Sequence, residues 1–332
     1  MTKTTLRAAL LSAALVQPAA AEEVLTAVHA FPASLIYSQS FLDFVETVNE
    51  RGEGVVRIDV RGGPEAVGMF QQVDAVRNGV VDMAYQPGSF YAGAFPERDA
   101  LVASDITAVE ARENGGIDLI NEIHQEKMGL WYLGWFDSGV TYNLWTVNEP
   151  ELDAEGKLDV SGIRLRGNSV YNAFFTDYLG AQVIDLPTTD VYSALERGVV
   201  DATGWTQIGL MDLRWNEFLN YRIEPNFFST DLGVIVNLDA WTALSEEAQR
   251  IVQETAIEHE RSSMEKLSAR AAEEIAALEE AGMTTITLEG AAAENFSKAA
   301  RQTSYDRMRA QMQEHPMGLE HYERLIELFS AD

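Results

Sequence analysis

The chain has 332 residues, of which 24 are basic and 52 acidic, and its formal net charge at pH 7 is −28. A surface this acidic repels nucleic-acid phosphates and anionic lipids, which argues strongly against either as a partner. The absence of cysteine excludes disulfides, thiol chemistry and a cysteine-linked lipid anchor. A chain of this length can form two ordinary domains with their own cores, so covalent cross-links are unnecessary.

The first 21 residues, MTKTTLRAALLSAALVQPAAA, have the order of an export signal. Lys3 and Arg7 give a positive start, residues 8–16 an apolar stretch too short to span a bilayer, and residues 19–21 a small-residue cleavage site. The alternative is an N-terminal amphipathic helix of the folded protein. We expect export to a bacterial periplasm, with cleavage near Ala21. No later segment approaches the ~20 apolar residues of a membrane helix, so we expect no direct membrane insertion.

Patterns typical of strands and of helices alternate along the remaining chain, which predicts an α/β fold. Strands are expected at GVVRIDVRGG (54–63), GLWYLGWF (129–136) and SGIRLRGNS (161–169), and helices at 34–50 and 170–179. The first strand alternates apolar and polar residues, whereas the second is apolar almost throughout, as a buried strand is.

The tetrapeptide GVVD occurs twice, in VDAVRNGVVDMAYQ (73–86) and in YSALERGVVDATGW (192–205). In each segment, apolar residues at helical spacing precede a glycine at the expected helix end, Gly79 or Gly198, and a short apolar run follows that we interpret as a strand. Coincidence of a common pattern is the alternative, but eight consecutive positions match in character. The repeat therefore predicts two α/β lobes, one in each half of the chain.

Residues 245–282 form one long helical pattern, with Ser245 at its start and Gly282 at its end. Such a helix is too long for one compact lobe, so we expect it to run across or along the molecule. A short strand, MTTITLE, and a helical tail should follow. A coiled-coil dimer is the alternative, although the apolar spacing is irregular and rich in alanine.

No catalytic or cofactor-binding motif is present. The histidines form no HExxH or other paired-ligand spacing, and GxSxG, GxxxxGK[ST], GxGxxG and EF-hand patterns are missing. Carboxylates are abundant, so counting alone does not exclude a glycosidase-like pair. We expect a protein that is not an enzyme and has no cofactor or metal.

The segment GIRLRGNSVYNAFFTDYLG (162–180) contains the best candidate for ligand binding. Arg166 ends the expected strand, directly before a short loop and the helix that follows it. An arginine that faces a helix N-terminus can hold a carboxylate through two parallel hydrogen bonds. The alternative is an arginine in a surface ion pair, which forms easily in so acidic a chain.

The run KLDVSGIRLRGNSVYNAFFTDYLGAQVIDLPTTDVYSALERGVVDATGW (157–205) resembles the solute-binding proteins of tripartite ATP-independent periplasmic (TRAP) transporters, the DctP-like family. In that family a G-x-K-x-R strand, an lGA helix end and an S-E-V-Y-x-A-L-x-x-G-x-V-D unit follow one another. Segments 44–85 and 238–252 match more loosely. The resemblance implies a two-lobed periplasmic-binding-protein-like fold, with a ligand cleft between the lobes and a long helix crossing them. It also implies capture of a small carboxylate and its delivery to TRAP membrane permease subunits.

The resemblance assigns ligand-binding roles residue by residue. The arginine that ends the family's strand holds the ligand carboxylate, and its position here is Arg166. The other matching positions are Asn168, Ser169, Tyr85, Phe90 and Thr188, with Phe228 as a looser match.

Two departures from the family pattern change the expected ligand. VDATGWT replaces the common V-D-G-Q-E-N-P, so Trp205 occupies an asparagine position. A second arginine common in the family is missing from SGVTYNLW, where Tyr142 is the expected substitute. Together with Tyr85, Phe90 and Tyr37, these residues would suit an apolar or aromatic carboxylate better than a sugar acid.

The repeated unit also predicts where the cleft lies. In open α/β sheets, ligands bind beyond the carboxyl ends of the strands, so Tyr85 and Trp205 should line opposite walls of one cleft. The repeated aspartates, Asp82 and Asp201, should tie strand ends to backbone N–H groups. The expected segments are a signal peptide at 1–21, lobe 1 mainly at 22–145, lobe 2 mainly at 146–235, and a long helix with a C-terminal segment at 236–332. A ligand-binding partner of a sensor kinase and, less favoured, a periplasmic hydrolase are the alternative functions.

Overall fold

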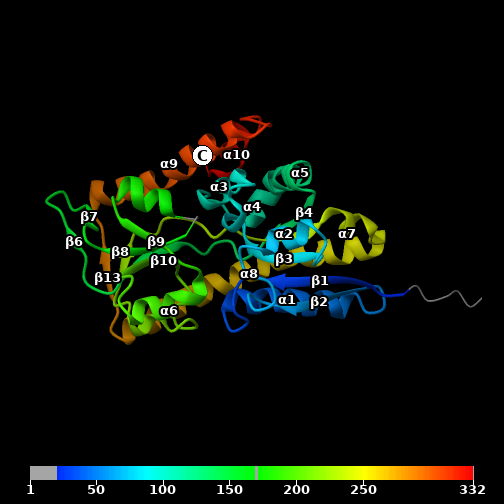
Figure 1. Cartoon of the computed structure of the whole chain (residues 1–332), viewed down its shortest axis with the longest axis horizontal. Helices are drawn as coiled ribbons and strands as arrows, with labels where there is room; N and C mark the ends of the chain where they lie inside the picture. Colours follow the sequence, from blue (N-terminus) through cyan, green and yellow to red (C-terminus); the bar gives the residue numbers. More distant parts are fainter. Residues whose placement is uncertain (1–20, 169–170, 332) are drawn as a thin grey trace, which may run out of the picture.

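The computed structural model describes residues 21–168 and 171–331, which form two lobes side by side along the long axis of the molecule (Figure 1). The expected export signal, except Ala21, and Ser169 lie outside the described residues. Each lobe has its own sheet covered by helices, so the predicted two-lobed α/β fold is confirmed. Within the described residues, no helix has both the length and the apolar character needed to cross a membrane.

Lobe 1 is built on a five-stranded sheet with the order β2-β1-β3-β12-β4, in which β12 runs antiparallel to both neighbours. Its strands are β1 (Glu23–His29), β2 (Val56–Gly62), β3 (Met83–Pro87), β4 (Leu130–Trp135) and β12 (Leu232–Asn237). Its helices are α1 (Ile36–Arg51), α2 (Gln72–Arg77), α3 (Asp99–Val102), α4 (Ala108–Glu113), α5 (Gly116–Met128) and α7 (Leu238–Ala243), with 3-10 turns η1 (Gly88–Tyr91) and η2 (Pro96–Arg98). The strands predicted at 54–63 and 129–136 and the helix at 34–50 are confirmed as β2, β4 and α1.

Lobe 2 is built on a six-stranded sheet with the order β13-β11-β5-β10-β8-β9, in which β5 runs antiparallel to both neighbours. Its strands are β5 (Tyr142–Thr146), β8 (Arg164–Gly167), β9 (Gln182–Asp185), β10 (Ala202–Thr206), β11 (Tyr221–Glu224) and β13 (Thr284–Thr287), and a separate hairpin contains β6 (Glu151–Leu152) and β7 (Leu158–Asp159). Its helical segments are η3 (Phe174–Tyr178), α6 (Thr188–Glu196) and η4 (Trp215–Glu217). The helix predicted at 170–179 is mainly the short π-helical segment η3.

The two GVVD segments have the same structure, one in each lobe. Gly79 and Gly198 follow α2 and α6 with φ of +67° and +61°. The next N–H, of Val80 or Val199, bonds a carbonyl in the last turn of the helix at 2.8 Å, as in a glycine-terminated helix end. The strand begins only after the aspartate, so the assignment of both valines to the strand was wrong. The hydrogen bonds that close the helix hold Val80 and Val199 in the turn.

The aspartates of the repeat hold neighbouring strands in register. Asp82 accepts the backbone N–H of Thr26 in β1 at 2.7 Å. Asp201 accepts the backbone N–H of Arg164 in β8 at 3.2 Å and two N–H groups of its guanidinium at 2.8 Å. The prediction that these aspartates tie strand ends to backbone N–H groups is confirmed.

Two connecting segments, 136–141 and 225–231, join the strands of the two sheets. They contact each other, because Thr141 pairs with Ser229 in an isolated bridge and the N–H of Thr230 bonds the carbonyl of Val140 at 3.0 Å. The division into domains remains a proposal. We place its boundaries in these segments, a few residues before the expected positions 145 and 235.

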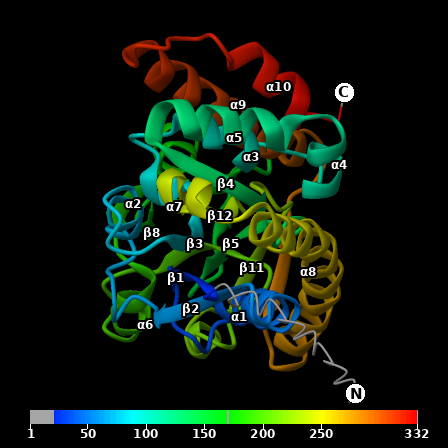
Figure 2. The same cartoon turned by 90° about the vertical axis from the view of Figure 1, so that its right-hand side faces the viewer.

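The helix α8 (Glu246–Glu280) runs across both lobes (Figures 1 and 2). Ser245 caps its first turn, as predicted. In lobe 1 the carboxylate of Glu260 accepts the backbone N–H of Trp135 at 2.8 Å, and in lobe 2 that of Glu274 accepts the N–H of Gly209 at 2.9 Å. Because both carboxylates are buried, the helix is anchored to each lobe by its own polar contact.

A second connection is made by α9 (Gly290–Glu314), which α10 (Tyr322–Phe329) follows near α5 (Figure 2). In lobe 2, Phe296 packs edge-on against Phe174, with ring centroids 5.0 Å apart. In lobe 1, Arg307 forms two hydrogen bonds to Asp99, at 2.6 and 2.7 Å. The C-terminal segment is therefore shared between the lobes.

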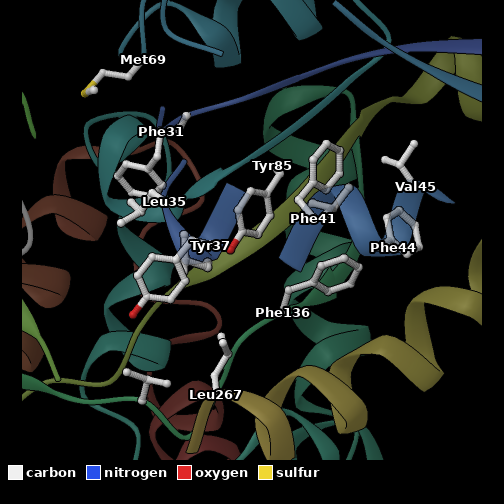
Figure 3. Packing of buried hydrophobic residues seen from close by; sticks show 14 of the residues in the cluster. Phe31, Leu35, Tyr37, Phe41, Phe44, Val45, Met69, Tyr85, Phe136 and Leu267 are labelled. Carbon is white, nitrogen blue, oxygen red and sulfur yellow. The ribbon is translucent and has the colours of Figure 1, made fainter. Parts of the chain in front are cut away.

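The largest hydrophobic cluster contains side chains from α1, β3, α8 and lobe 2. Figure 3 shows Tyr85 beside Phe41 and Phe136, and the rings of Tyr85 and Phe41 stack with centroids 5.2 Å apart. Trp145 and Trp205 of lobe 2 belong to the same cluster. The lobes therefore share buried apolar surface in the described structure.

Candidate ligand cleft

Arg166 lies at the carboxyl end of β8 and is almost completely buried, with 1% of its surface exposed. Its Nε and Nη2 donate to the Leu186 carbonyl oxygen at 3.0 and 2.8 Å, and its Nη1 donates to the Tyr171 hydroxyl at 2.5 Å. That hydroxyl donates to the Gly204 carbonyl at 2.8 Å. These contacts fix the guanidinium and leave one N–H on each terminal nitrogen without an acceptor among the described residues.

The partners of Arg166 in the described part of the chain are all neutral oxygens. Three other buried cationic side chains of the described structure each have a carboxylate within ion-pair distance: Arg98 with Asp99 at 2.6 Å, Lys127 with Glu97 at 2.7 Å and Arg222 with Glu224 at 3.1 Å. Burial of a cation without an opposite charge is unfavourable, and an arginine cannot lose its proton to escape it. Arg166 is therefore positioned to take its opposite charge from a bound anion.

A cavity of ≈350 Å³ lies between the lobes next to the end of β8; Arg166 itself is not among its lining residues, but its sequence neighbour Gly167 and its hydrogen-bond partner Leu186 are. Lobe 1 contributes Phe70, Ser89, Phe90, Ala92 and Gly93 to its wall, and lobe 2 contributes Gly167, Asn168, Asp185, Leu186 and Pro187. The lobe 2 wall thus includes the residue after Arg166 and the residue whose carbonyl holds its guanidinium. Phe90 and Asn168, both expected from the sequence to bind the ligand, lie in this wall, and their contact with a ligand stays a prediction.

Thr188 is the first residue of α6, directly after the cavity wall. Its side chain is buried, and its hydroxyl has no hydrogen-bond partner among the described residues. A buried hydroxyl without a partner is unfavourable unless water or a ligand bonds it. The position of Thr188 therefore suits the ligand-binding role expected for it, which stays a prediction.

Three aromatic residues of the expected site lie deeper, with their polar groups already bonded. The hydroxyl of Tyr37 donates to Thr206 at 2.8 Å, that of Tyr85 donates to Asp137, and the Trp205 indole N–H donates to the Ile208 carbonyl at 3.0 Å. All three are buried in the shared hydrophobic cluster and are not among the residues lining the cavity beside Arg166. Their contact with a ligand stays a prediction.

Tyr142 lies nearer to the arginine. Its ring packs edge-on against Tyr171, with centroids 6.0 Å apart. Burial raises the pKa of the Tyr142 phenol and the carboxylate of Asp231 adds to this, whereas Arg166 and Arg98 lower it. Phe228, the looser match, is buried in the lobe 2 core.

Several residues around the cleft were not predicted from the sequence. Asp231, on the second connecting segment, accepts the N–H and hydroxyl of Ser89 at 2.7 and 3.2 Å, so it holds the lobe 1 cavity wall in place. Arg98 is a second arginine near Tyr142, but it is paired with Asp99. Their grouping depends on contacts between distant residues, which leave no local sequence pattern.

Comparisons with known proteins show the family to which the chain belongs. The model of the family "Bacterial extracellular solute-binding protein, family 7" (DctP) matches residues 27–311. A solute-binding protein of Albidiferax ferrireducens is 27% identical over 200 residues, which are 57% of this chain and 57% of that protein. A monocarboxylate 2-oxoacid-binding periplasmic protein of a Nostoc species is 24% identical over 284 residues, covering 78% of this chain and 71% of that protein.

Solved structures share the fold. A TRAP periplasmic solute-binding protein of Desulfovibrio salexigens with bound orotic acid has a TM-score of 0.78 and 18% identity, covering 93% of this chain and 97% of that one. DctP7 of Bordetella pertussis, an extracytoplasmic solute receptor that binds pyroglutamic acid, has a TM-score of 0.77 and 18% identity, covering 92% and 99%. The resemblance seen in the sequence is thereby confirmed. The chain belongs to family 7 of the bacterial extracellular solute-binding proteins, the DctP family.

Proposed function

We propose that this protein is the solute-binding subunit of a TRAP transporter, which captures a small organic acid in the cleft and delivers it to the membrane permease. The observation that carries the proposal is Arg166, a buried cation whose partners among the described residues are all neutral. A ligand carboxylate would supply the missing negative charge and bond the N–H groups left on the two terminal nitrogens. The relatives whose names include organic acids support the same ligand class.

The chemistry of the proposed step is binding and release. The carboxylate would enter between the lobes, and Arg166 would hold it where burial strengthens the charge-assisted hydrogen bonds. Asn168, Phe90 and Thr188 would surround it. The other proposed contacts are Ser169, Tyr85, Tyr142, Trp205, Tyr37 and Phe228. Ligand recovered chemically unchanged after long incubation is the expected result for a receptor of this family, and conversion beyond one equivalent would contradict it.

A thermal-shift screen of small carboxylates tests the proposal directly. A ligand present at 100 times its Kd should raise the free energy of unfolding by about 2.7 kcal/mol. Arg166→Gln should abolish this stabilisation. Arg164→Gln is the matched control, because Arg164 lies on the same strand but is exposed and paired with Asp201. If no carboxylate stabilises the protein, or if both variants respond as the parent does, the proposed function is wrong.

Delivery and location need separate measurements. We expect the mature protein, cleaved near Ala21, in the periplasmic fraction of its host, and uptake of the ligand only when it is expressed together with its permease. Uptake by the permease alone would contradict the role in delivery. Recovery of the protein in salt-washed membranes without the permease would contradict the location.

A further inference from the structure

A second cavity, of ≈620 Å³, adjoins the one beside Arg166. The two cavities share Phe70 of lobe 1 and Pro187 of lobe 2 in their walls. The wall of the second also includes Pro32, Pro64 and Glu65 of lobe 1 and Thr189 of lobe 2. The space beside the arginine therefore continues between the lobes.

Phe70 stands where the two cavities meet. Its side chain is 43% exposed, although phenylalanine is usually buried. Its ring packs edge-on against Phe90 at 4.9 Å, and Phe90 packs in the same way against Phe31 at 6.0 Å. Phe31 contacts Trp205 at 6.1 Å. A row of aromatic rings thus leads from the exposed Phe70 to the buried cluster, and it offers apolar surface at its outer end.

The charged side chains described on the cavity walls are acidic. The charged side chains that line the two cavities are Asp185 and Glu65, and no lysine or arginine is among the lining residues described. Glu65 is held by the backbone N–H of Gly63 at 2.7 Å, a bond that lowers the pKa of its carboxyl. A second carboxylate on the ligand would therefore meet negative charge without a nearby cation.

We propose that the two cavities form one channel for a monocarboxylate with an extended apolar tail. Arg166 holds the carboxylate, the tail lies between Phe70 and Pro187, and Phe70 determines specificity. The proposal rests on the proposed function, since it takes Arg166 as the carboxylate site, and it narrows the ligand class to acids with one charge and an apolar body.

Isothermal titration with two series of acids tests the channel. The first series is the linear monocarboxylates from acetate to octanoate, and the second is the α,ω-dicarboxylates of the same lengths. For the parent protein we expect affinity to rise about three- to four-fold for each added methylene, the ratio that burial of one methylene gives. Dicarboxylates should bind at least about 10-fold more weakly than monocarboxylates of equal length.

Four variants separate the parts of the proposal. Phe70→Ala should flatten the dependence of affinity on chain length, so that octanoate loses far more affinity than acetate, whereas Phe70→Leu should retain most of that dependence. Leu152→Ala is the matched control, since Leu152 is 45% exposed on β6 and is not among the lining residues. Glu65→Gln should reduce the discrimination against dicarboxylates.

The outcomes distinguish this inference from the function on which it rests. If monocarboxylates bind in an Arg166-dependent manner with equal affinity at every length, or if Phe70→Ala weakens acetate and octanoate equally, the channel is wrong and the proposed function stands. If no acid of either series binds, and none does in the broader screen, the proposed function fails and the channel with it. A melting temperature of ligand-free Phe70→Ala close to that of the parent excludes misfolding as the cause of a loss.

Discussion

Two buried regions of this molecule differ in the partners of their cationic side chains. In lobe 1, Arg98 bonds Asp99 and Lys127 bonds Glu97, at 2.6 and 2.7 Å, and all four side chains are almost completely buried. In lobe 2, Arg166 is equally buried, but its partners among the described residues are a carbonyl and a hydroxyl. The ion pairs of lobe 1 connect side chains within the fold. A charge left without its opposite is unfavourable for the ligand-free protein, which is why we assign it to ligand binding.

The lobe 1 region also connects distant parts of the chain. Asp99 accepts hydrogen bonds from Arg307 of α9 in addition to its ion pair with Arg98. Because α9 also packs against lobe 2 through Phe296, this carboxylate helps to attach the C-terminal segment to both lobes. The comparison therefore predicts structural effects at Asp99 and binding effects at Arg166.

The largest expected effect is that of Asp99→Asn. The variant removes a buried carboxylate that bonds both Arg98 and Arg307, so the free energy of unfolding should fall by about 3–5 kcal/mol. Urea unfolding of parent and variant measures this. Asp43→Asn is the control, because it breaks an exposed pair with Lys266 and should cost less than about 1 kcal/mol. A loss for Asp99→Asn as small as that of the control would remove the contrast between the two regions.

Asp137 shows how a buried acid differs from a buried arginine. Its carboxylate accepts hydrogen bonds from Tyr85 and Ser40, and no cation lies within ion-pair distance among the described residues. Burial raises its pKa to about 6, although these hydrogen bonds and the charge of Lys266 lower it. An acid can take up a proton to avoid an isolated charge, whereas an arginine cannot. Asp137 can thus lose its charge below about pH 6 and is bonded by two hydroxyls above it, whereas Arg166 stays charged at every pH and lies next to a cavity wall, so we assign a ligand to Arg166 and not to Asp137.

This difference predicts a pH dependence at Asp137. Its pKa is higher in the folded than in the unfolded chain, so its stabilising contribution is complete below pH ~4 and is lost as the pH rises through about 6. Relative to Asp137→Asn, the parent should lose about 3 kcal/mol over this range and change little above it. Chemical unfolding of both proteins between these limits gives the difference. If the free energies of unfolding of the two proteins change in parallel with pH, burial does not raise the pKa of Asp137.

Arg166→Lys tests the binding role assigned to Arg166 in lobe 2, and its expected effect is smaller than those at Asp99 and Asp137. Lysine keeps the charge but cannot offer two parallel donors to a carboxylate. Affinity for an identified acid should fall at least ~10-fold, or about 1.4 kcal/mol. The melting temperature of the ligand-free variant should change little, because the lysine ammonium can still donate to the Leu186 carbonyl or the Tyr171 hydroxyl and no ion pair among the described residues is broken. Unchanged affinity by isothermal titration, or an unfolded variant, would make Arg166 a structural residue like Arg98.

The features that could be predicted from the sequence are those set by local interactions. The start of α8 at Ser245 and the glycine turns after α2 and α6 depend on residues within a few positions of each other. The place of Arg166 near the end of a strand is also set locally, and its role in binding stays a prediction. The valines of GVVD were misassigned because β-branched residues favour strands, while the hydrogen bonds that end each helix keep them in the turn.

The charge balance of the cleft could not be predicted in the same way. Arg98 has a carboxylate partner, and within the described residues Arg166 has none, because the fold decides which carboxylates come close. Arg307, which also bonds Asp99, lies 208 positions from it. The hydroxyl of Tyr85 reaches Asp137 only because β3 and the first connecting segment meet. Phe70 had no distinguishing neighbours in the sequence, and its exposure at the junction of two cavities is a property of the folded chain.

The prediction with the smallest expected effect compares the equivalent glycine turns of the two lobes. Gly79 and Gly198 occupy equivalent turns, and a Cβ added at either would meet no atom within 4 Å. Replacing either with alanine therefore adds only the left-handed backbone strain, about 1 kcal/mol at each site. Thermal or urea unfolding of Gly79→Ala and Gly198→Ala should give equal losses, and carboxylate binding to Arg166 should be unchanged in both. If Gly198→Ala alone weakened binding, the turn before β10 would be coupled to the cleft, and the difference between the lobes would extend beyond the neutralisation of their arginines.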